Sequence, residues 1–166
     1  AIIYVGAKPV YVDVDPHTYN INPVKIEKKI NSKTRVVLAQ NTFGLSPDLD
    51  KIVSIARDRG LHVVEDCAHG FGGKYKGQPN GVIADAAFFS SQWNKPFSTG
   101  IGGFAVTRNS ELSLRLSELE KHAVCPSFTE KISLKIQLFL RDHFINQTTY
   151  WNAINMYRFL SRHNIV

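Results

Sequence analysis

The chain has 166 residues, 43 % of them hydrophobic, and a formal net charge of +6 at pH 7. This size and apolar content suit one globular domain that buries roughly two thirds of its unfolded surface, and no apolar run approaches the roughly 20 residues of a membrane span. The charge is spread along the chain, +4 through Arg108 (13 basic minus 9 acidic residues) and +2 beyond it (7 minus 5), which argues against a nucleic-acid-binding stripe.

Short β-type runs alternate with helical stretches along most of the chain, which predicts an α/β fold with a mainly parallel sheet flanked by helices. Five runs are the expected strands: Val10–Val14, Val36–Ala39, His62–Glu65, Ala86–Phe89 and Gly103–Val106. Three stretches with helical spacing are the expected helices: Pro23–Ile30, Asp48–Arg59 and Ser110–Lys121. A polar turn or small hairpin is expected over Tyr75–Gly81.

The helix over Asp48–Arg59 has a start and a stop signal. Asp48 directly precedes an apolar face that begins at Leu49, so its carboxylate is placed to cap the first turn. Gly60 supplies the residue that ends the helix.

After about Pro126 apolar residues recur at helical spacing and predict two amphipathic helices, Lys131–Phe144 and Tyr150–Arg162. The aromatic residues of these helices fit a core or an interface better than a base-stacking surface, because they follow the helical period and form no stripe with basic residues. Nothing in this region therefore points to nucleic acid.

Asp66 and Lys95 each follow an apolar run that ends at the edge of the predicted sheet. Asp66 closes the run that begins at Leu61, and Lys95 comes shortly after Asp85–Ser90. Open α/β sheets bind ligands at the carboxyl ends of their strands, so the two side chains are expected close together. Pyridoxal phosphate (PLP) needs a protein amine for a Schiff base, and a carboxylate that keeps its pyridine nitrogen protonated. The pair therefore suggests a PLP enzyme.

Taken singly, these residues also have ordinary interpretations. A lone lysine is usually a solvated surface charge, Asp66 could cap a following helix, and His69 and Ser90 could be simple packed residues. Gly70–Gly73 superficially matches a dinucleotide-binding fingerprint, but no apolar helix follows it. No His, Cys and carboxylate cluster has zinc spacing, so no metal is expected.

Four motifs together carry a resemblance to a known family. They are Ala7–Asp15, Phe43–Gly44 followed by Asp48–Asp50, Glu65–Gly70, and Ser90–Lys95 followed by Gly102–Gly103. In order, spacing and residue type the chain from Ala1 to His122 resembles the DegT/DnrJ/EryC1/StrS sugar aminotransferases. The resemblance implies the type I PLP-dependent fold, a three-layer, mainly parallel sheet with flanking helices, here incomplete. Residues 1–122 would be part of the PLP-binding large domain, and residues 123–166 a helical connector toward a C-terminal small domain.

The resemblance also implies a role for each matching residue. Lys95 corresponds to the lysine that forms the Schiff base with PLP, and Asp66 to the partner of the pyridine nitrogen. Ser90 matches the serine that binds the cofactor phosphate. His69 falls where the family has Gln or His near the pyridine ring, and Asn41 falls where many relatives have a His that faces the cofactor.

The chain departs from the family pattern in two ways. Around the lysine it has Ser91-Gln92-Trp93-Asn94 and Pro96, where the family usually has an aromatic residue and a proline before the lysine and Asn after it. This suggests a subgroup with a different substrate edge. The family chain is more than twice this long, and its Gly-Thr or Gly-Ser phosphate-binding turn and ring-stacking aromatic lie upstream of Ala1. We therefore expect an internal fragment, consistent with the absence of an initiator methionine.

The function implied by the resemblance is transamination of a nucleotide-linked keto-sugar by a dimeric parent enzyme, with an amino acid such as glutamate or glutamine as donor. A cytoplasmic location is expected, because Cys67 and Cys125 give no disulfide framework. Two alternatives stay open. One is a PLP-dependent keto-sugar dehydratase, against which Lys95 argues because that branch has histidine there. The other is a non-catalytic remnant or a regulatory or interaction module: the missing phosphate turn favours it, whereas Asp66, Ser90 and Lys95 favour catalysis.

Overall fold

The computed structural model describes residues 2–144 and 146–163. The chain divides into two compact units, residues 1–123 and residues 124–166. The first unit contains the sheet and three of the longer helical segments, and the second contains two helices. We describe each unit by itself.

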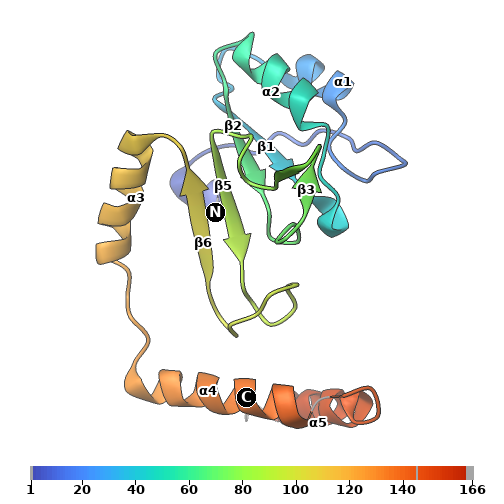
Figure 1. Cartoon of the computed structure of the whole chain (residues 1–166), viewed down its shortest axis with the longest axis vertical. Coiled ribbons are helices and arrows are strands. Elements are labelled where there is room, and N and C mark those ends of the chain that lie inside the picture. The colour runs from blue at the N-terminus through green and yellow to red at the C-terminus, as the bar shows by residue number, and fades with distance from the viewer. Residues whose placement is uncertain (1, 145, 164–166) are drawn as a thin grey trace. The chain divides into compact units, whose positions relative to one another are not determined.

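The first unit is built on a four-stranded, mostly parallel sheet (Figure 1). Its strands are β1 (Val36–Gln40), β2 (His62–Asp66), β5 (Ala86–Ser90) and β6 (Gly103–Thr107), in the order β1-β2-β5-β6. The first three run parallel, and β6 pairs antiparallel with β5. The structure thus confirms the predicted sheet and four of its strands, each extended by one residue at its carboxyl end.

Helices cover one face of this sheet. Helix α1 (Pro23–Ile26) continues into a 3-10 turn, Glu27–Lys29, and packs beside α2 (Leu49–Arg57) over β1 and β2. The core between them is apolar and consists of Ile26, Val37, Ala39, Leu49, Ile52, Val53, Ala56, Val63 and Ala84. Burial of these residues is what holds the strands in register, since a slip of one residue would turn every core side chain to the other face.

The ends of α2 follow the sequence signals. Asp48 accepts a hydrogen bond from the Lys51 amide at 3.5 Å and from the Tyr75 hydroxyl at 3.1 Å. The hydrogen bond from the Lys51 side chain holds the pKa of Asp48 below its ordinary value. At the other end the helix stops at Arg57, two residues earlier than expected, and Gly60 takes a left-handed φ of 64°. Asp48 is therefore confirmed as the N-cap.

The predicted strand Val10–Val14 is wrong. Its last residue forms only an isolated antiparallel bridge with Ile21, and Asp15 donates its amide hydrogen to the Asn20 carbonyl at 2.8 Å. The segment is thus part of a local turn, and Tyr11 is 83 % exposed. A β-type run becomes a strand only when a neighbour pairs with its backbone, and no strand in the described part of the chain lies alongside this one.

The remaining elements of the first unit are short or peripheral. A small antiparallel hairpin, β3 (Lys74–Tyr75) with β4 (Gln78–Pro79), confirms the turn predicted there. Helix α3 (Ser110–Lys121) has the predicted bounds, and the preceding residue Asn109 is its N-cap, whose side chain accepts from the Leu112 amide at 3.0 Å. Two further 3-10 turns lie at Ile3–Val5 and Thr42–Gly44.

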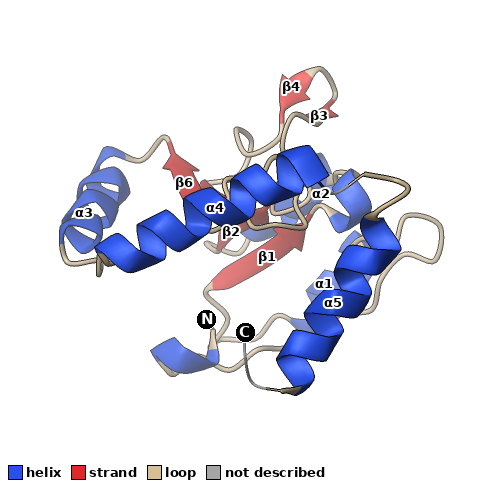
Figure 2. Ribbon diagram, turned by 90° about the horizontal axis from the view of Figure 1, so that it is seen from below, coloured by secondary structure: helices blue, strands red, loops and turns tan. Residues whose placement is uncertain are grey.

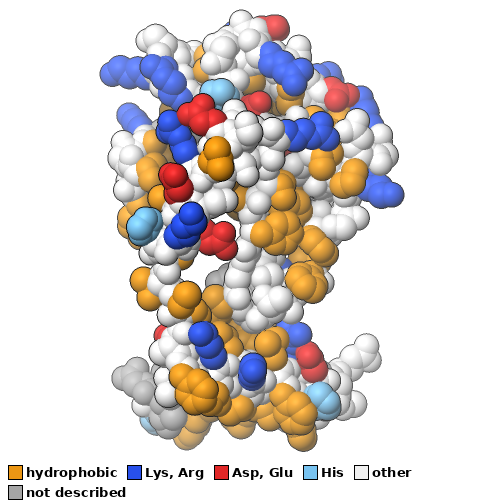
Figure 3. Space-filling view, turned by 60° about the vertical axis from the view of Figure 1, so that its left-hand side comes forward, with side chains coloured by type: hydrophobic (Ala, Val, Ile, Leu, Met, Phe, Trp, Pro, Cys, Tyr) orange, Lys and Arg blue, Asp and Glu red, His pale blue; other side chains and the backbone are white. Residues whose placement is uncertain are grey.

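The second unit consists of α4 (Phe128–Phe144) and α5 (Tyr150–Arg162), and Figure 2 shows each of them as a continuous helix. Helix α4 begins three residues before the predicted start, because Ser127 and Glu130 form a capping box in which the Glu130 carboxylate accepts from the Ser127 amide at 2.7 Å. No helix in the described residues is long and apolar enough to cross a membrane. Basic and acidic side chains are intermixed on the face shown in Figure 3.

Candidate functional site

Asp66 and Ser90 end two neighbouring parallel strands and lie on the same face of the sheet. Asp66 pairs with Phe88 across β2 and β5, and Ser90 is two residues after Phe88. Because side chains alternate along a strand, Asp66, Phe88 and Ser90 share the face opposite to the helical core. That face is partly open, with Phe88 38 % exposed. The structure thus brings a carboxylate and a hydroxyl to one edge of the sheet.

The backbone on both sides of Asp66 is fixed by neighbouring segments. The Asn41 amide donates to the Asp66 carbonyl at 2.9 Å, and the Cys67 amide donates to the Phe88 carbonyl at 2.9 Å. One side-chain oxygen of Asp66 accepts from the Ala68 amide, also at 2.9 Å. These bonds hold the carboxylate at the strand end while leaving its second oxygen for another donor.

Lys95 meets His69 although the two residues are 26 positions apart in the chain. The Lys95 Nζ lies 3.2 Å from the His69 Nε2, and both side chains are half-buried. A lysine ammonium donates this hydrogen bond when the histidine nitrogen carries no proton. His69 is in the turn that follows β2, and Lys95 is in the loop that joins β5 to β6. The two predicted residues therefore form a direct pair beside the strand end that carries Asp66.

Residues 91–102 form the loop that carries Lys95, and local hydrogen bonds shape it. The Lys95 amide donates to the Gln92 carbonyl at 3.0 Å, and the Ser91 and Thr99 hydroxyls lie 2.7 Å apart. Gly102 has a φ of 153°, and a Cβ there would lie 2.8 Å from the Ser91 Oγ. Ser90 itself makes a long contact, accepting from the Gln92 amide at 3.4 Å. The Ser90 hydroxyl is thus only weakly engaged within the loop.

The structure places Asn41 in a different environment from the other predicted residues. Asn41 is fully buried, and its Nδ2 donates to the Glu65 Oε1 at 2.9 Å and to the Cys67 Sγ at 3.2 Å. Its Oδ1 is buried without a hydrogen-bond partner among the described residues. The amide group is therefore bound on the core side of the β2 end, and its contact with a cofactor stays a prediction.

Glu65 belongs to the site's framework, and the sequence reasoning did not single it out. It is fully buried, and its two oxygens accept from the Asn41 Nδ2 and from the Gly81 amide, each at 2.9 Å. The signal was present in the alternation of β2, because Val63 faces the core and Glu65 therefore faces it too. A carboxylate at a core position of a strand is unusual enough to mark a structural hydrogen-bond network.

A family model that describes the DegT/DnrJ/EryC1/StrS aminotransferases matches residues 1–143. The chain belongs to this family. Two curated relatives illustrate the similarity. A GDP-perosamine synthase of Escherichia coli O157:H7 is 42 % identical over 112 residues, which are 68 % of this chain and 31 % of that protein. An L-glutamine:scyllo-inosose aminotransferase of Streptomyces griseus is 39 % identical over 119 residues, 72 % of this chain and 28 % of that protein.

A solved structure supports the same assignment for the fold. The PLP form of a putative sugar aminotransferase from Streptococcus pneumoniae has a TM-score of 0.64 and 30 % sequence identity, over 68 % of this chain and 34 % of that chain. The chain spans about a third of the length of the curated relatives it matches. The family resemblance expected from the sequence motifs is thus confirmed, together with the α/β fold and its mostly parallel sheet with flanking helices.

Aminotransferases of this family are PLP enzymes, and the residues present here fit that cofactor. Lys95 offers an amine, and Asp66 offers the carboxylate oxygen that does not accept from the Ala68 amide. Ser90 offers a hydroxyl that makes only a long hydrogen bond, at 3.4 Å. All three lie at or just beyond the carboxyl ends of β2 and β5, where α/β sheets bind ligands. These three groups therefore fit part of what this cofactor requires, an amine, a carboxylate and a hydroxyl.

Cys67 adjoins Asp66 but is not placed to react. Burial, and then the nearby Glu65 carboxylate, raise the pKa of the Cys67 thiol well above its ordinary value. The thiolate, which is the nucleophilic form, is consequently rare at neutral pH. We interpret Cys67 as a small core residue beneath the site.

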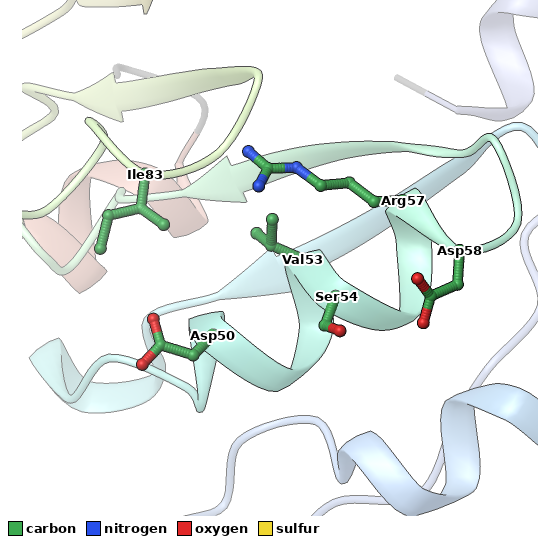
Figure 4. A pocket seen from close by; sticks show the side chains of 6 residues that line it. All are labelled: Asp50, Val53, Ser54, Arg57, Asp58 and Ile83. Carbon is green, nitrogen blue, oxygen red and sulfur yellow. The ribbon is translucent and has the colours of Figure 1, made fainter.

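A shallow hollow of about 300 Å³ lies away from these residues, along α2 (Figure 4). Its lining comprises Asp50, Val53, Ser54, Arg57, Asp58 and Ile83. Figure 4 shows Asp50, Arg57 and Asp58 spread along the helix, so charges of both signs line the hollow. Such a mixture selects neither anions nor cations, and none of the predicted site residues is present there.

Proposed function

We propose that this chain carries the lysine-bearing half of the PLP site of a sugar aminotransferase. The single observation that supports this most is the contact of the Lys95 Nζ with the His69 Nε2 at 3.2 Å, beside the strand end that bears Asp66. A lysine held in a half-buried position by a histidine is uncommon on a plain protein surface. Because the chain belongs to an aminotransferase family, we interpret the Lys95 amine of this pair as the group that would bind PLP.

Each residue has a proposed task at a stated atom. The Lys95 Nζ would hold the cofactor covalently and, as a free amine, would move a proton from the α-carbon of the amino donor to the C4′ carbon of the cofactor. The Asp66 carboxylate would keep the pyridine nitrogen protonated, the Ser90 hydroxyl would donate to the phosphate, and His69 would orient the Lys95 amine. When bound, PLP supplies the electron sink that stabilises negative charge at the donor carbon.

The proposed substrates are a nucleotide-linked keto-sugar as acceptor and an amino acid, glutamate or glutamine, as donor. Two relatives support this choice by their names, a GDP-perosamine synthase and an L-glutamine-dependent aminotransferase. We further propose a homodimer for the full-length enzyme. A cytoplasmic location accords with two free cysteines, Cys67 and Cys125.

The test of the cofactor site is covalent trapping. The purified chain is mixed with PLP, reduced with borohydride, and digested, and the pyridoxyl group is located by peptide mass mapping. We expect one major adduct, at Lys95, which Lys95→Ala removes, whereas the matched surface variant Lys33→Ala leaves the adduct in place. Labelling scattered over many lysines, or none at Lys95, would reject the proposal and favour a non-catalytic role for this chain.

A further inference from the structure

Four phenylalanine rings form a connected set of contacts, and two of them come from the segments that carry His69 and Lys95. We call Phe71, Phe89, Phe97 and Phe104 the aromatic cluster. The rings of Phe89 and Phe104 stack at a centroid distance of 4.6 Å, and those of Phe71 and Phe97 stack at 5.3 Å. The Phe71 ring also lies nearly perpendicular to the rings of Phe89 and Phe104, with a centroid distance of 6.1 Å to each. Phe71 is thus the ring that contacts all the others.

The cluster joins three separate segments of the first unit. Phe89 and Phe104 are directly paired across β5 and β6, so they form a fixed base on the sheet. Phe71 comes from the turn after β2, two residues after His69. Phe97 comes from the loop of residues 91–102, two residues after Lys95. The stack of Phe71 on Phe97 therefore links the two segments that supply His69 and Lys95.

Hydrogen bonds within the Lys95 loop shape it but leave its position to other contacts. The bonds of Lys95 to Gln92 and of Ser91 to Thr99 lie within residues 91–102. They fix the curvature of the loop, and the Lys95–His69 contact at 3.2 Å is a hydrogen bond that spans the gap between the loop and the His69 turn. The ring stack lies across that gap, and it stays partly exposed, with Phe71 at 44 % and Phe97 at 48 %. Rings so exposed contribute little to core burial, so the stack of Phe71 on Phe97 is a link between two segments and not part of the core.

From this arrangement we infer that Phe71 and Phe97 are positioning residues, which set the Lys95 amine against His69 by stacking across the two loops. The inference rests on the proposed function for its catalytic meaning, because the pair being positioned is the proposed attachment site of PLP. The contact itself is a property of this chain without any ligand. It can therefore be tested both with and without PLP.

The test without PLP is amide hydrogen exchange in the full chain. Phe71→Leu removes a ring from the His69 turn, and we expect exchange at the Lys95 and Thr99 amides of the other segment to become about two- to tenfold faster. Reciprocally, Phe97→Leu should speed exchange at the Gly70 and Gly73 amides, which donate to Cys67 and Gly70. Amides within β1 should be unchanged in both variants.

The test with PLP measures the rate of borohydride-trapped labelling at Lys95. Each leucine variant should slow labelling by about two- to tenfold, and the double variant should slow it no more than the slower single variant, since both remove one shared contact. Phe97→Tyr keeps the ring and should restore the rate. Phe43→Leu, at a 79 % exposed phenylalanine outside the cluster, is the matched control and should leave it unchanged. Thermal unfolding of every variant separates loss of position from loss of fold.

Each outcome decides the inference separately from the proposed function. Reciprocal changes in exchange support positioning even if the wild-type chain takes no label at Lys95, a result that rejects only the proposed PLP site. Labelling of wild type and leucine variants at the same rate, with unchanged exchange, overturns the positioning role and leaves the proposed PLP site standing. Slowing effects of Phe71→Leu and Phe97→Leu that multiply in the double variant also overturn it, because the rings would then act independently.

Discussion

Glu65 and Asp66 are neighbours in β2 and carry the same chemical group, yet they face opposite sides of the sheet. Glu65 is fully buried on the helical side, where Asn41 and Gly81 donate to both of its oxygens. Asp66 is half-buried on the other side, where, among the described residues, one oxygen accepts a hydrogen bond from the Ala68 amide and the other has no hydrogen-bond donor. The comparison teaches that one strand can use adjacent carboxylates for different purposes, one to hold the framework and one to remain available to a ligand.

The largest expected effect is on the framework side. Glu65→Leu should lower the free energy of unfolding by about 2–5 kcal/mol, because it leaves the Gly81 amide buried without its acceptor and the Asn41 Nδ2 with the weak Cys67 Sγ acceptor alone. Denaturant unfolding measures this. The double variant with Asn41→Leu should recover part of the loss, since it also removes one of the two donors that lose the Glu65 carboxylate. A matched change at the exposed Glu27, Glu27→Leu, should have little effect, and equal losses at both positions would contradict the framework role.

The next effect is on the ligand side and concerns binding. Asp66→Asn keeps an oxygen for the Ala68 amide, so the free energy of unfolding should change by less than about 1 kcal/mol. It removes the charge that would pair with the pyridine nitrogen, so PLP affinity should fall about 10- to 100-fold, as expected for a hydrogen bond to a charged group. Absorbance titration with PLP measures the affinity. If Asp66→Asn destabilises the fold as much as Glu65→Leu, the contrast between the two faces is lost.

The smallest effect concerns a third carboxylate, that of Asp48 at the N-terminus of α2. Its folded-state pKa is lowered, chiefly by the hydrogen bond from Lys51, so its contribution to stability is present above the unfolded value and is lost as pH falls through the folded value. Asp48→Asn keeps the cap and should cost less than about 1 kcal/mol at pH 7.

The pH dependence of this stability difference tests whether the charge of Asp48 is responsible. The difference in stability between wild type and Asp48→Asn should shrink as pH falls below the unfolded value near 3.8, since the wild-type carboxylate is protonated first in the unfolded chain and then, at its lowered pKa, in the folded one. Chemical unfolding at several pH values measures it. A difference that stays constant with pH would show that Asp48 acts only through its shape.

The sequence predicted the parts of the fold that rest on local pattern. Four strands, the hairpin at residues 74–79 and the bounds of α3 and α5 followed from periodicity and turn residues, which are properties of short segments. The segment Val10–Val14 failed because its β-type composition is local whereas strand pairing is not. The early start of α4 was readable in Ser127 and Glu130, and it was missed because the apolar period begins later.

For the site, the sequence indicated which residues to consider but not the contacts between them. Asp66 and Lys95 were expected together from the strands that precede them, and the family motifs indicated His69 and Ser90. No spacing in the sequence predicts that the Lys95 Nζ and the His69 Nε2 lie 3.2 Å apart. Glu65 was hidden because a Glu-Asp pair at a strand end looks like two surface acids until the register is known. The ring contacts of the aromatic cluster join segments with different strand partners, so they depend on the whole sheet.

The mixed direction of the strands also bears on how the site is assembled during folding. Strands β5 and β6 form an antiparallel hairpin around the loop that carries Lys95, and we expect this contact between segments close in the chain to form early. The turn with Asp66 and His69 is placed by the parallel pairs β1–β2 and β2–β5, which need crossover connections and close more slowly. We therefore expect the loop that carries Lys95 to form before the turn that carries Asp66 and His69. The site would then be complete only when the parallel strands have paired.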